Sequence, residues 1–370
     1  MKAKVYFTNV RTRPGNNLYD KLDKLIRKAG IESMDLKDKL VALKIHFGEP
    51  GNLAYIRPNY AARIVKKVKE MGGKPFLTDC NTLYYGRRSN AVDHLEAAME
   101  NGFNRIAVNC DVIIADGLTG TDAVEIPLNM KHVQNAKIGT VIADANVIIS
   151  LTHFKGHEQT GFGGTLKNVG MGCGSRKGKM EMHSASKPEM IENNCVACGM
   201  CIKNCPEEAI AYNDRHKAEI DYEKCIGCGQ CVASCHYGSA RAIYDQSVEI
   251  LSEKIAEYAY AVLEGKQHFH ISFIMNVSPD CDCSNVNDQA LVPDIGIAAS
   301  FDPVALDKAC VDLVNSAPAI RESRLFDNNS FNQGEDKFGH VHPDVHWKDC
   351  LKHAEEIHLG TREYELIEVN

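Results

Sequence analysis

Several features are scarce or missing in this chain of 370 residues, and each absence excludes a class of protein. No apolar run approaches the roughly 18 residues of a membrane-spanning helix. Positive charge is not in excess, and the net charge of −7 argues against a nucleic-acid-binding surface. The opening segment MKAKVYFTNVRTRPG lacks the apolar stretch of a secretory signal peptide. We therefore expect a cytoplasmic protein with neither a membrane nor a nucleic acid among its partners.

Well-known catalytic and nucleotide-binding motifs are also missing. The sequence has no GxSxG, no HExxH and no set of kinase motifs. It has no GxxxxGK[ST] motif, and no GxGxxG in the strand–turn–helix context of a dinucleotide-binding domain. The chemistry must therefore come from other residues.

Cysteine, in contrast, is abundant, and eight of the 15 cysteines lie between residues 195 and 235. They form two runs of the spacing CxxCxxCxxxC. Three cysteines at this spacing enclose one face of an iron–sulfur cube, and in two-cluster ferredoxins the fourth ligand comes from the other run. The runs therefore predict two [4Fe–4S] clusters, one held by Cys195, Cys198, Cys201 and Cys235 and the other by Cys225, Cys228, Cys231 and Cys205.

Zinc and disulfides are the alternatives for these cysteines. Structural zinc sites use separated CxxC pairs rather than two full runs. Many thiols without a secretion signal indicate a reducing compartment, where cysteines bind metals rather than cross-link. Because exposed clusters and thiolates are sensitive to oxidation, we expect an anaerobic source.

Apolar periodicity on both sides of the cysteine-rich segment predicts alternating strands and helices, which is typical of an α/β fold with a mostly parallel sheet flanked by helices. We expect a discontinuous α/β domain, residues 1–189 and 246–370, with an inserted α+β dicluster ferredoxin-like module at 190–245. The predicted strands are 3–10, 40–47, 74–79, 112–115, 123–128, 147–151, 268–277, 292–299 and 364–369, and the predicted helices are 18–29, 58–71, 91–101, 248–263, 303–314 and 347–357.

Polar residues lie at the carboxyl ends of three of the predicted strands, at positions 44–46, 78–81 and 152–157. Ligands bind at the carboxyl ends of strands in such sheets. In the third segment, His153 and His157 at positions i and i+4, beside Lys155, offer a metal ligand, a proton shuttle and an anion contact. A solvated surface loop is the alternative for this segment.

A glycine-rich stretch comes next, with Gly163 and Gly164 directly before the helix-compatible segment TLKNVGM. Backbone N–H groups at such a helix N-terminus bind anions, and Lys167 would add positive charge. A flexible hinge that leads into the inserted module is the alternative.

Cys281 and Cys283 form a CxC pair after the predicted strand 268–277. With Cys173 or His183 they would bind a metal ion or a further cluster. They would otherwise be a redox thiol pair, or two free cysteines in a loop. Further on, Asp302 precedes a proline and is expected to cap the helix that starts there, whereas Asp307 is expected at the surface.

The segments HFKGHEQTGFGGTLKNVGMGCGSRKGKMEMH, the two cysteine runs, PDCDC and DIGIAASFDPVALD occur in this order. This combination resembles the domain-of-unknown-function family three-six-two, in its form with an internal dicluster ferredoxin module. The resemblance covers nearly the whole chain and is weakest at 1–40 and 320–345. It implies one site beside the clusters, formed by Lys155, His157, Lys167, Asn168, Cys173, His183, Cys281, Cys283 and Asp302.

These features predict an iron–sulfur oxidoreductase that takes electrons from a ferredoxin-like donor and acts on a small anionic molecule. A pure electron carrier and a redox- or metal-sensing binding protein are the alternatives. A further metal ion or a flavin stays open as an additional cofactor. The expected catalytic residues are Lys155, His157, Lys167 and Asn168, the expected cofactor contacts are Gly163, Gly164 and Lys44, and the expected additional metal or thiol centre is Cys281, Cys283 and Cys173.

Overall fold

The computed structural model describes residues 2–235, 237–327, 331–332 and 334–369. Its centre is a sheet of eight described strands in the order β16-β1-β15-β14-β7-β2-β3-β4. Strand β15 runs antiparallel to both neighbours, and the other described pairings in this sheet are parallel. The strands are β1 (Ala3–Asn9), β2 (Leu40–Ile45), β3 (Lys74–Asp79), β4 (Asp111–Ile114), β7 (Val147–His153), β14 (Gln267–Ile274), β15 (Gly296–Ser300) and β16 (Tyr364–Glu368).

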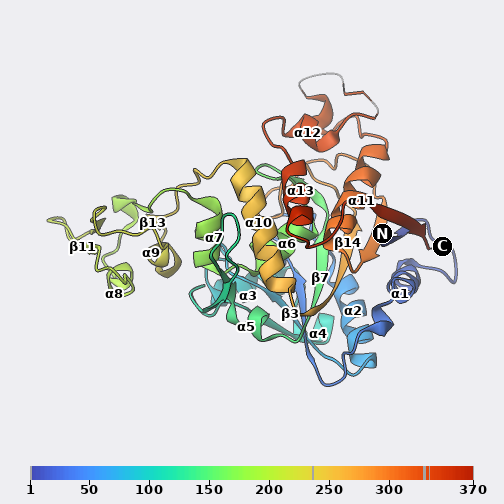
Figure 1. The fold of residues 1–370 in the computed structure, drawn as a ribbon, viewed down its shortest axis with the longest axis horizontal. Coiled ribbons are helices and arrows are strands. Elements are labelled where there is room, and N and C mark those ends of the chain that lie inside the picture. Colours follow the sequence, from blue (N-terminus) through green and yellow to red (C-terminus); the bar gives the residue numbers. More distant parts are fainter. Residues whose placement is uncertain (1, 236, 328–330, 333, 370) are drawn as a thin grey trace.

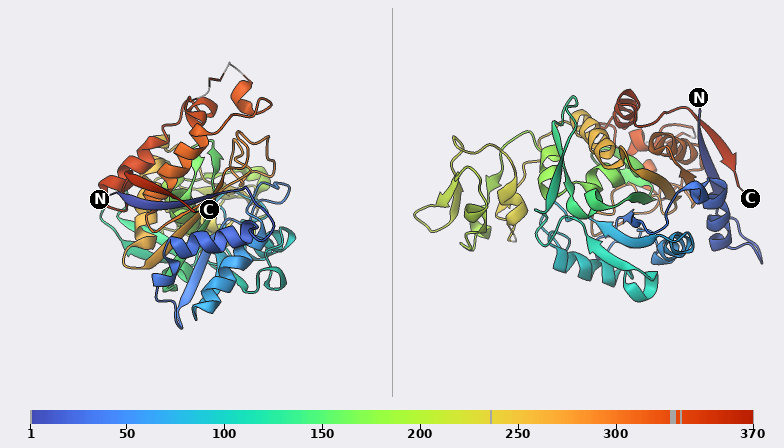
Figure 2. Two further views of the ribbon diagram at one scale, coloured as in Figure 1. Left: turned by 90° about the vertical axis from the view of Figure 1, so that its right-hand side faces the viewer. Right: turned by 60° about the horizontal axis from the view of Figure 1, so that its bottom comes forward.

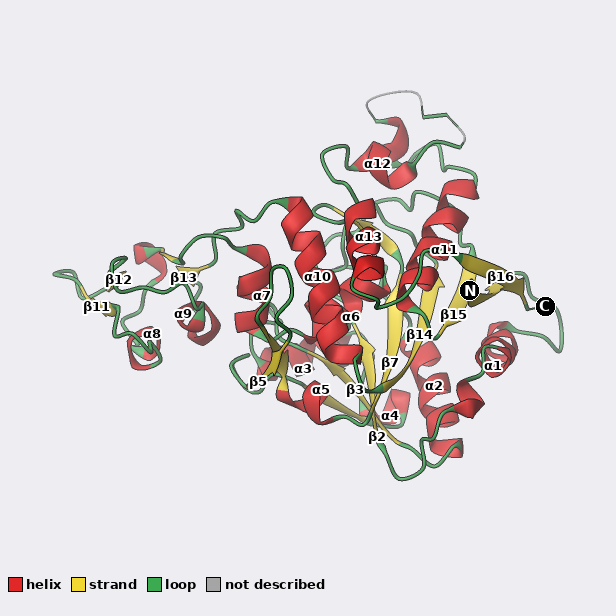
Figure 3. Ribbon diagram, viewed as in Figure 1, coloured by secondary structure: helices red, strands yellow, loops and turns green. Residues whose placement is uncertain are grey.

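Helices cover both faces of this sheet (Figures 1, 2 and 3). Side chains alternate along β2, so that Val41 and Leu43 enter the core with α1 and α2, while Ala42 enters the core with α6, α10, α11 and α13. The helices are α1 (Leu18–Lys28), α2 (Pro58–Glu70), α3 (Ala91–Glu100), α4 (Arg105–Val108), α5 (Thr140–Asp144), α6 (Thr165–Cys173), α7 (Arg176–His183), α10 (Val248–Leu263), α11 (Pro303–Ser316), α12 (Lys337–Val341) and α13 (Lys348–Glu356).

The central strand β7 shows why the strands of the sheet were predictable from the sequence. All seven of its residues are buried, because β2 and β14 pair with it on both sides and helices cover both faces. A parallel strand in this position reads as a nearly continuous apolar run. The predicted fold class, an α/β structure with a mostly parallel sheet flanked by helices, is confirmed.

The cysteine-rich segment projects from one side of this body, at the left of Figure 1. Its short strands pair as two antiparallel ribbons, β10 with β13 and β11 with β12. Helix α9 packs against α7 of the α/β body. The elements of this module are β10 (Glu189–Met190), α8 (Met200–Lys203), β11 (Ile210–Tyr212), β12 (Ala218–Ile220), α9 (Gln230–Ser234) and β13 (Ala240–Arg241).

Several elements differ from the sequence-based expectation. The strand expected at 292–299 begins only at Gly296. The strand expected at 123–128 is present as β5 (Ala123–Pro127), and its partner β6 (Asn135–Gly139), with which it forms a separate ribbon, was not expected. The hairpin of β8 (Lys155–His157) and β9 (Gly161–Gly163) and the helix α7 were not expected. None of the described helices has the length and apolar character that a membrane crossing requires.

Candidate functional site

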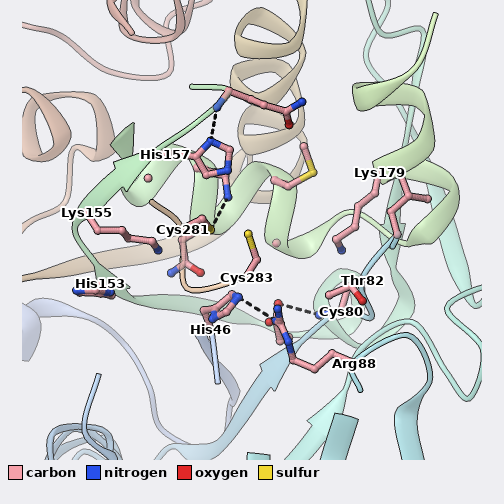
Figure 4. A pocket seen from close by; sticks show the side chains of 18 of the residues that line it. His46, Cys80, Thr82, Arg88, His153, Lys155, His157, Lys179, Cys281 and Cys283 are labelled. Carbon is pink, nitrogen blue, oxygen red and sulfur yellow. Dashed lines mark hydrogen bonds between the residues drawn. The ribbon is translucent and has the colours of Figure 1, made fainter. Parts of the chain in front are cut away.

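A cavity of about 280 Å³ lies at the carboxyl ends of β2, β3 and β7. Lys44 reaches it from β2, Asp79 from the end of β3, and Thr152 and His153 from the end of β7. Helices α6 and α7 and the loop after β14 complete its wall (Figure 4). This is the edge at which open α/β sheets bind ligands, so the polar strand ends converge where the sequence predicted them to act.

The loop after β14 carries Cys281 and Cys283 into this cavity, and Gly156 of β8 allows its position. A side chain at residue 156 would bring its Cβ within 1.9 Å of the Pro279 carbonyl oxygen, so glycine is required for this close approach. As a result, a ring nitrogen of His157 and the sulfurs of both cysteines lie within 4.8 Å of one another.

Asp282, between the two cysteines, is fully buried. Its carboxylate oxygens lie 2.8 and 3.0 Å from Nδ1 of His153, and one lies 3.4 Å from Nζ of Lys155. Burial alone would raise the pKa of Asp282, but His153 and Lys155 outweigh this effect and hold the pKa well below its usual range. Asp282 thus fixes the loop that carries the two cysteines.

The sulfur of Cys281 is surrounded by hydrogen-bond donors. Nζ of Lys167 lies 3.4 Å from it, and the His157 ring also donates to it (Figure 4). A hydrogen bond from Cys283 is the main reason why the pKa of Cys281 is held well below its usual value. The same bond raises the pKa of Cys283 well above its usual value. The negative charge of the pair is therefore favoured on Cys281 and disfavoured on Cys283.

The tautomer of His157 follows from its backbone contacts. Its Nδ1 accepts hydrogen bonds from the backbone N–H groups of Gln159 and Thr160, at 3.1 and 3.2 Å. The proton of the neutral ring must therefore be on Nε2, which faces Cys281. His157 is a fixed donor to the thiolate.

Asn168 holds helix α6 against the sheet and orients Lys44. Its side-chain NH₂ donates to the Leu151 carbonyl at 3.1 Å and to Oγ1 of Thr152 at 3.0 Å, while its Oδ1 accepts from Nζ of Lys44 at 2.8 Å. The same Nζ lies 2.9 Å from Oδ1 of Asp79. Burial raises the pKa of Asp79, but the surrounding positive side chains, of which Lys44 has the largest effect, together outweigh burial and the net pKa falls well below its usual range.

A second buried ion pair closes the opposite wall. Nε of Arg88 lies 2.7 Å from Oε2 of Glu49, and its Nη1 lies 2.9 Å from Nε2 of His46. Burial and the neighbouring charge of Arg88 lower the pKa of His46 well below its usual value. Tyr84 donates to the carbonyl of Cys283 at 3.2 Å and links this wall to the cysteine loop.

Helix α7 contributes Lys179 and His183 from the side of the cysteine-rich module. Lys179 donates to the carbonyl of Gly174. Nδ1 of His183 is buried without a hydrogen-bond partner in the described part of the chain, and burial lowers the pKa of His183 to about 3. The Tyr244 ring packs edge-on against His183, with the ring centres 5.1 Å apart.

In the module, the eight cysteines of the two runs line two small cavities. Backbone N–H groups of Ala209 and Ser239 donate to Sγ of Cys205 and Cys235 at 3.2 and 3.3 Å. Cys205 and Cys235 are the fourth cysteines of the two runs, so the two halves of the module have the same local structure at these positions. Cys195, Cys198, Cys201 and Cys235 line one cavity, and Cys205, Cys225, Cys228 and Cys231 line the other.

Residues 41–312 match the family model described as domain of unknown function, DUF362. The chain belongs to the DUF362 family. No curated protein matches it.

Two solved structures are similar to this DUF362 chain at low identity. The lactate racemase apoprotein from Thermoanaerobacterium thermosaccharolyticum is 10% identical over 84% of this chain and 56% of its own, with a TM-score of 0.38. A Thermotoga maritima protein solved by a structural genomics consortium is 13% identical over 79% of this chain and 57% of its own, with a TM-score of 0.39. This chain spans a little over half the length of each.

The cavity of this DUF362 chain unites most residues that the sequence singled out, but Cys173 and Asp302 are not among the described residues that line it. Cys173 is buried; the thiol of Cys80 donates to its carbonyl at 3.3 Å, and burial raises the pKa of Cys173 to about 12. The residues that do line it are Lys44, Lys155, His157, Gly163, Gly164, Lys167, Asn168, His183, Cys281 and Cys283.

The N-terminus of α6 is closed to an external anion, because Asp307 fills it. Oδ1 and Oδ2 of Asp307 accept from the N–H groups of Thr165 and Leu166 at 2.6 and 2.9 Å. A Cβ on Gly164 would lie 2.5 Å from Oδ1 of Asp307, so glycine makes room for the carboxylate rather than for a ligand. Asp307 was expected at the surface but is fully buried. Asp302 caps α11, as its position before a proline predicted.

Sequence reasoning assigned no role to several cavity residues. Arg88 lies in the loop between β3 and α3, where a basic residue carries no special signal. Asp282 likewise carried no special signal, because acidic residues are common in solvated loops. The cavity-lining residues without an assigned role include His46, Asp79, Arg88 and Lys179. Asp282, which supports the cavity without lining it, also had no assigned role.

Proposed function

We propose that this DUF362 protein is an iron–sulfur oxidoreductase, with two [4Fe–4S] clusters in the module and a small anionic substrate in the main cavity. One observation carries the proposal. Each module cavity combines three cysteines of one run with the fourth cysteine of the other. This is the cross-ligation of two-cluster ferredoxins. When bound, such clusters supply single electrons.

The spacing of the sulfurs supports a cluster over a single zinc ion. Four sulfurs around zinc lie about 3.8 Å apart, because each Zn–S bond is about 2.3 Å long. Among the described residues, the set whose ligand atoms all lie within 4.8 Å is His157, Cys281 and Cys283, and it includes no module cysteine. The module sulfurs are therefore spaced more widely than a zinc ion requires, and this spacing suits a larger group. N–H donors to Cys205 and Cys235 add hydrogen bonds of the kind that tune cluster potentials.

Packed elements join the module to the cavity. Helix α9 packs on α7, and α7 lines the cavity through Lys179 and His183. Arg176 at the start of α7 donates to the carbonyl of Ala233 in α9 and, at 3.2 Å, to that of Leu83 beside the cavity. These contacts support electron passage between the module and the main cavity.

The charges of the main cavity support an anionic substrate. Lys44, Arg88 and Lys155 are each paired with a buried carboxylate. Lys167 and Lys179 also face the cavity, and neither has a carboxylate within 4.0 Å among the described residues. Lys179 is buried, and a buried ammonium group without a carboxylate favours an anion beside it. Nζ of Lys167 lies 3.4 Å from Sγ of Cys281 and adds positive charge to the same cavity.

The alternative of a pure electron carrier gives no role to these buried charges or to the CxC pair, because a carrier needs only its clusters and a docking surface. A sensor would use the cavity but would show no turnover. An external ferredoxin-like donor and a cytoplasmic, anaerobic setting complete the proposal.

Anaerobic purification or reconstitution tests the cluster part. We expect about eight irons and eight acid-labile sulfides per chain. Dithionite should bleach the visible absorption and produce the electron paramagnetic resonance signal of reduced clusters. The matched control is Cys110→Ser, a buried cysteine outside both runs, which should keep the same iron content. About four irons, or zinc in place of iron, would overturn the proposal.

A further inference from the structure

We propose that Cys281 and Cys283 are a dithiol–disulfide redox pair, and that the cavity takes a small disulfide that carries acidic groups. Both sulfurs line the cavity and lie within 4.8 Å of each other. Lys167 and His157 both donate to Cys281. This arrangement gives one activated sulfur with a second thiol beside it, which is the minimum that thiol–disulfide exchange requires.

The hydrogen bonds of His157 favour this pair over a metal site. A metal-binding histidine donates its other ring N–H to an acceptor. Nδ1 of His157 instead accepts from two backbone N–H groups, at 3.1 and 3.2 Å. A metal ion on Nε2 would require a proton on Nδ1, and this proton would point at the two backbone N–H groups that now donate to Nδ1. His157 is therefore arranged to donate to Cys281, not to bind a metal ion.

The surrounding charge also opposes a divalent cation. Nζ of Lys167 lies 3.4 Å from Sγ of Cys281, and Lys155 is a second ammonium group close enough to act on this sulfur. A dication at the two sulfurs would be repelled by both. The same charges stabilise a thiolate and attract an anionic substrate.

The reaction balances within the pair and its substrate. The Cys281 thiolate attacks one sulfur of R–S–S–R, a Cys281–S–S–R bond forms, and the S–S bond of the substrate breaks to release R–S⁻. That thiolate takes the proton of Cys283, whose sulfur then attacks Cys281 and releases the second R–S⁻. The substrate gains two electrons and the cysteine pair loses two. The products are one R–SH, one R–S⁻ and the Cys281–Cys283 disulfide.

Restoring the pair takes two electrons and one proton, which return Cys281 to the thiolate and Cys283 to the thiol. A reduced ferredoxin-type protein, acting through the module, is the reductant, and this half of the cycle rests on the proposed function. The first half does not depend on the module. The two proposals can therefore fail separately.

The cavity restricts the substrate to small molecules. Its volume of about 280 Å³ excludes a protein disulfide, and Cys281 is almost fully buried behind its rim. The ammonium groups of Lys167 and Lys179 select acidic groups next to the S–S bond. Carboxylates attached within a few bonds of the disulfide meet both requirements.

Three small disulfides that differ in charge test the proposal on anaerobic holoprotein. They are dithiodiglycolate, which is a dianion, bis(2-hydroxyethyl) disulfide, which is neutral, and cystamine, which is a dication. Peptide mass analysis follows the loss of two hydrogen atoms from the peptide that contains residues 281–283. We expect disulfide formation with dithiodiglycolate about tenfold faster than with the neutral compound, and slowest with cystamine.

The variant Cys283→Ser should stop the reaction at a stable mixed disulfide on Cys281, and Cys350→Ser is the control that should react like the wild type. If Cys283→Ser fails to fold, the relative rates of the three disulfides with the wild type still test the proposal. The proposal fails if no Cys281–Cys283 disulfide forms, if cystamine reacts fastest, or if added zinc alone binds at these residues and blocks the reaction.

Iron analysis of the same samples separates the two proposals. Holoprotein with about eight irons but no 281–283 disulfide would overturn the redox pair and leave the clusters standing. Rapid disulfide formation in a protein that never holds iron would overturn the clusters and leave the redox pair standing.

Discussion

The carboxylate of Asp282 lies 2.8 Å from Nδ1 of His153, and this contact fixes the loop that presents the cysteine pair. Cys281 and Cys283 line the cavity, while the side chain of Asp282 between them is buried against His153 and Lys155. The ring of His153 also faces the carbonyl of Met275 at 2.8 Å, so the loop is held at two points. The sulfur geometry thus depends on a residue that does not touch the cavity.

Asp282→Asn should destabilise the protein by about 3–5 kcal/mol at pH 7, because it leaves buried positive charge without its partner. The pKa of Asp282 is lowered in the folded protein, so its stabilising effect is present above the unfolded pKa of about 4 and is lost as the pH falls below that value. The difference in the free energy of unfolding between wild type and Asp282→Asn should therefore become smaller below about pH 4. Urea unfolding followed by circular dichroism measures both effects.

The matched control is Asp280→Asn in the same loop. Asp280 pairs with Arg324, and both side chains are about one-third exposed (34% and 32%), so its loss should cost about 0–1 kcal/mol. An equal cost for the two variants, or a difference that grows as the pH falls, would contradict the role given to Asp282.

The strands and helices of the α/β body were predictable because their apolar periods reflect burial against one sheet. Helix α7 was not, because its apolar residues are few and its polar side chains are buried by distant segments. Lys179 and Arg176, for example, are almost fully buried against the cavity wall and the module. Burial against distant parts of the chain leaves no apolar periodicity in the local sequence.

The site was predictable where chemistry and strand ends coincide, as for Lys155, His157 and the CxC pair. It was not predictable where the partner is far away in the chain. Asp307 caps α6 from 142 positions away, and its local sequence resembles an ordinary helix surface. The glycines before α6 accordingly looked like an anion site, although Asp307 already supplies the anion.

Cross-ligation in the module predicts how pairs of substitutions combine. Cys198→Ser with Cys235→Ser removes two ligands of one proposed cluster, so about four irons should remain. Cys198→Ser with Cys205→Ser removes one ligand of each, so both clusters should be weakened and the iron content should fall toward zero. Anaerobic iron analysis and electron paramagnetic resonance measure the difference.

Pairs taken from within one run provide the comparison. Cys198→Ser with Cys201→Ser should behave like Cys198→Ser with Cys235→Ser, because all three residues line the same cavity. If Cys205 and Cys198 instead behave as ligands of one cluster, each run binds its own cluster and the cross-ligation is wrong.

Arg176 should control how firmly the module is attached. Its guanidinium donates to the carbonyls of Ala233 and Leu83, and Arg176→Met would leave these buried groups unpaired at about 1–3 kcal/mol each. We expect chymotrypsin to cleave after Tyr244 about tenfold faster, because detachment of the module becomes more frequent. The iron content should not change.

Arg241→Met is the control for this experiment. Nε of Arg241 donates to the Gly238 carbonyl within the module at 2.8 Å, so its loss should not change attachment. Equal cleavage rates for wild type and Arg176→Met would show that other contacts hold the module in place.

Lys179→Gln should slow the reaction of the cysteine pair with dithiodiglycolate by about tenfold, because one of the two cavity ammonium groups without a carboxylate is lost. The rate with the neutral bis(2-hydroxyethyl) disulfide should stay within about twofold, since the sulfur chemistry itself is unaffected. Salt ions that enter the cavity should reduce the difference in rate between wild type and Lys179→Gln for the dianion. The reason is that the Debye length falls to about 3 Å at 1 M salt. The matched control is Lys177→Gln on the same helix, outside the described cavity lining. Equal slowing of both disulfides would mean that Lys179 shapes the cavity rather than selecting charge.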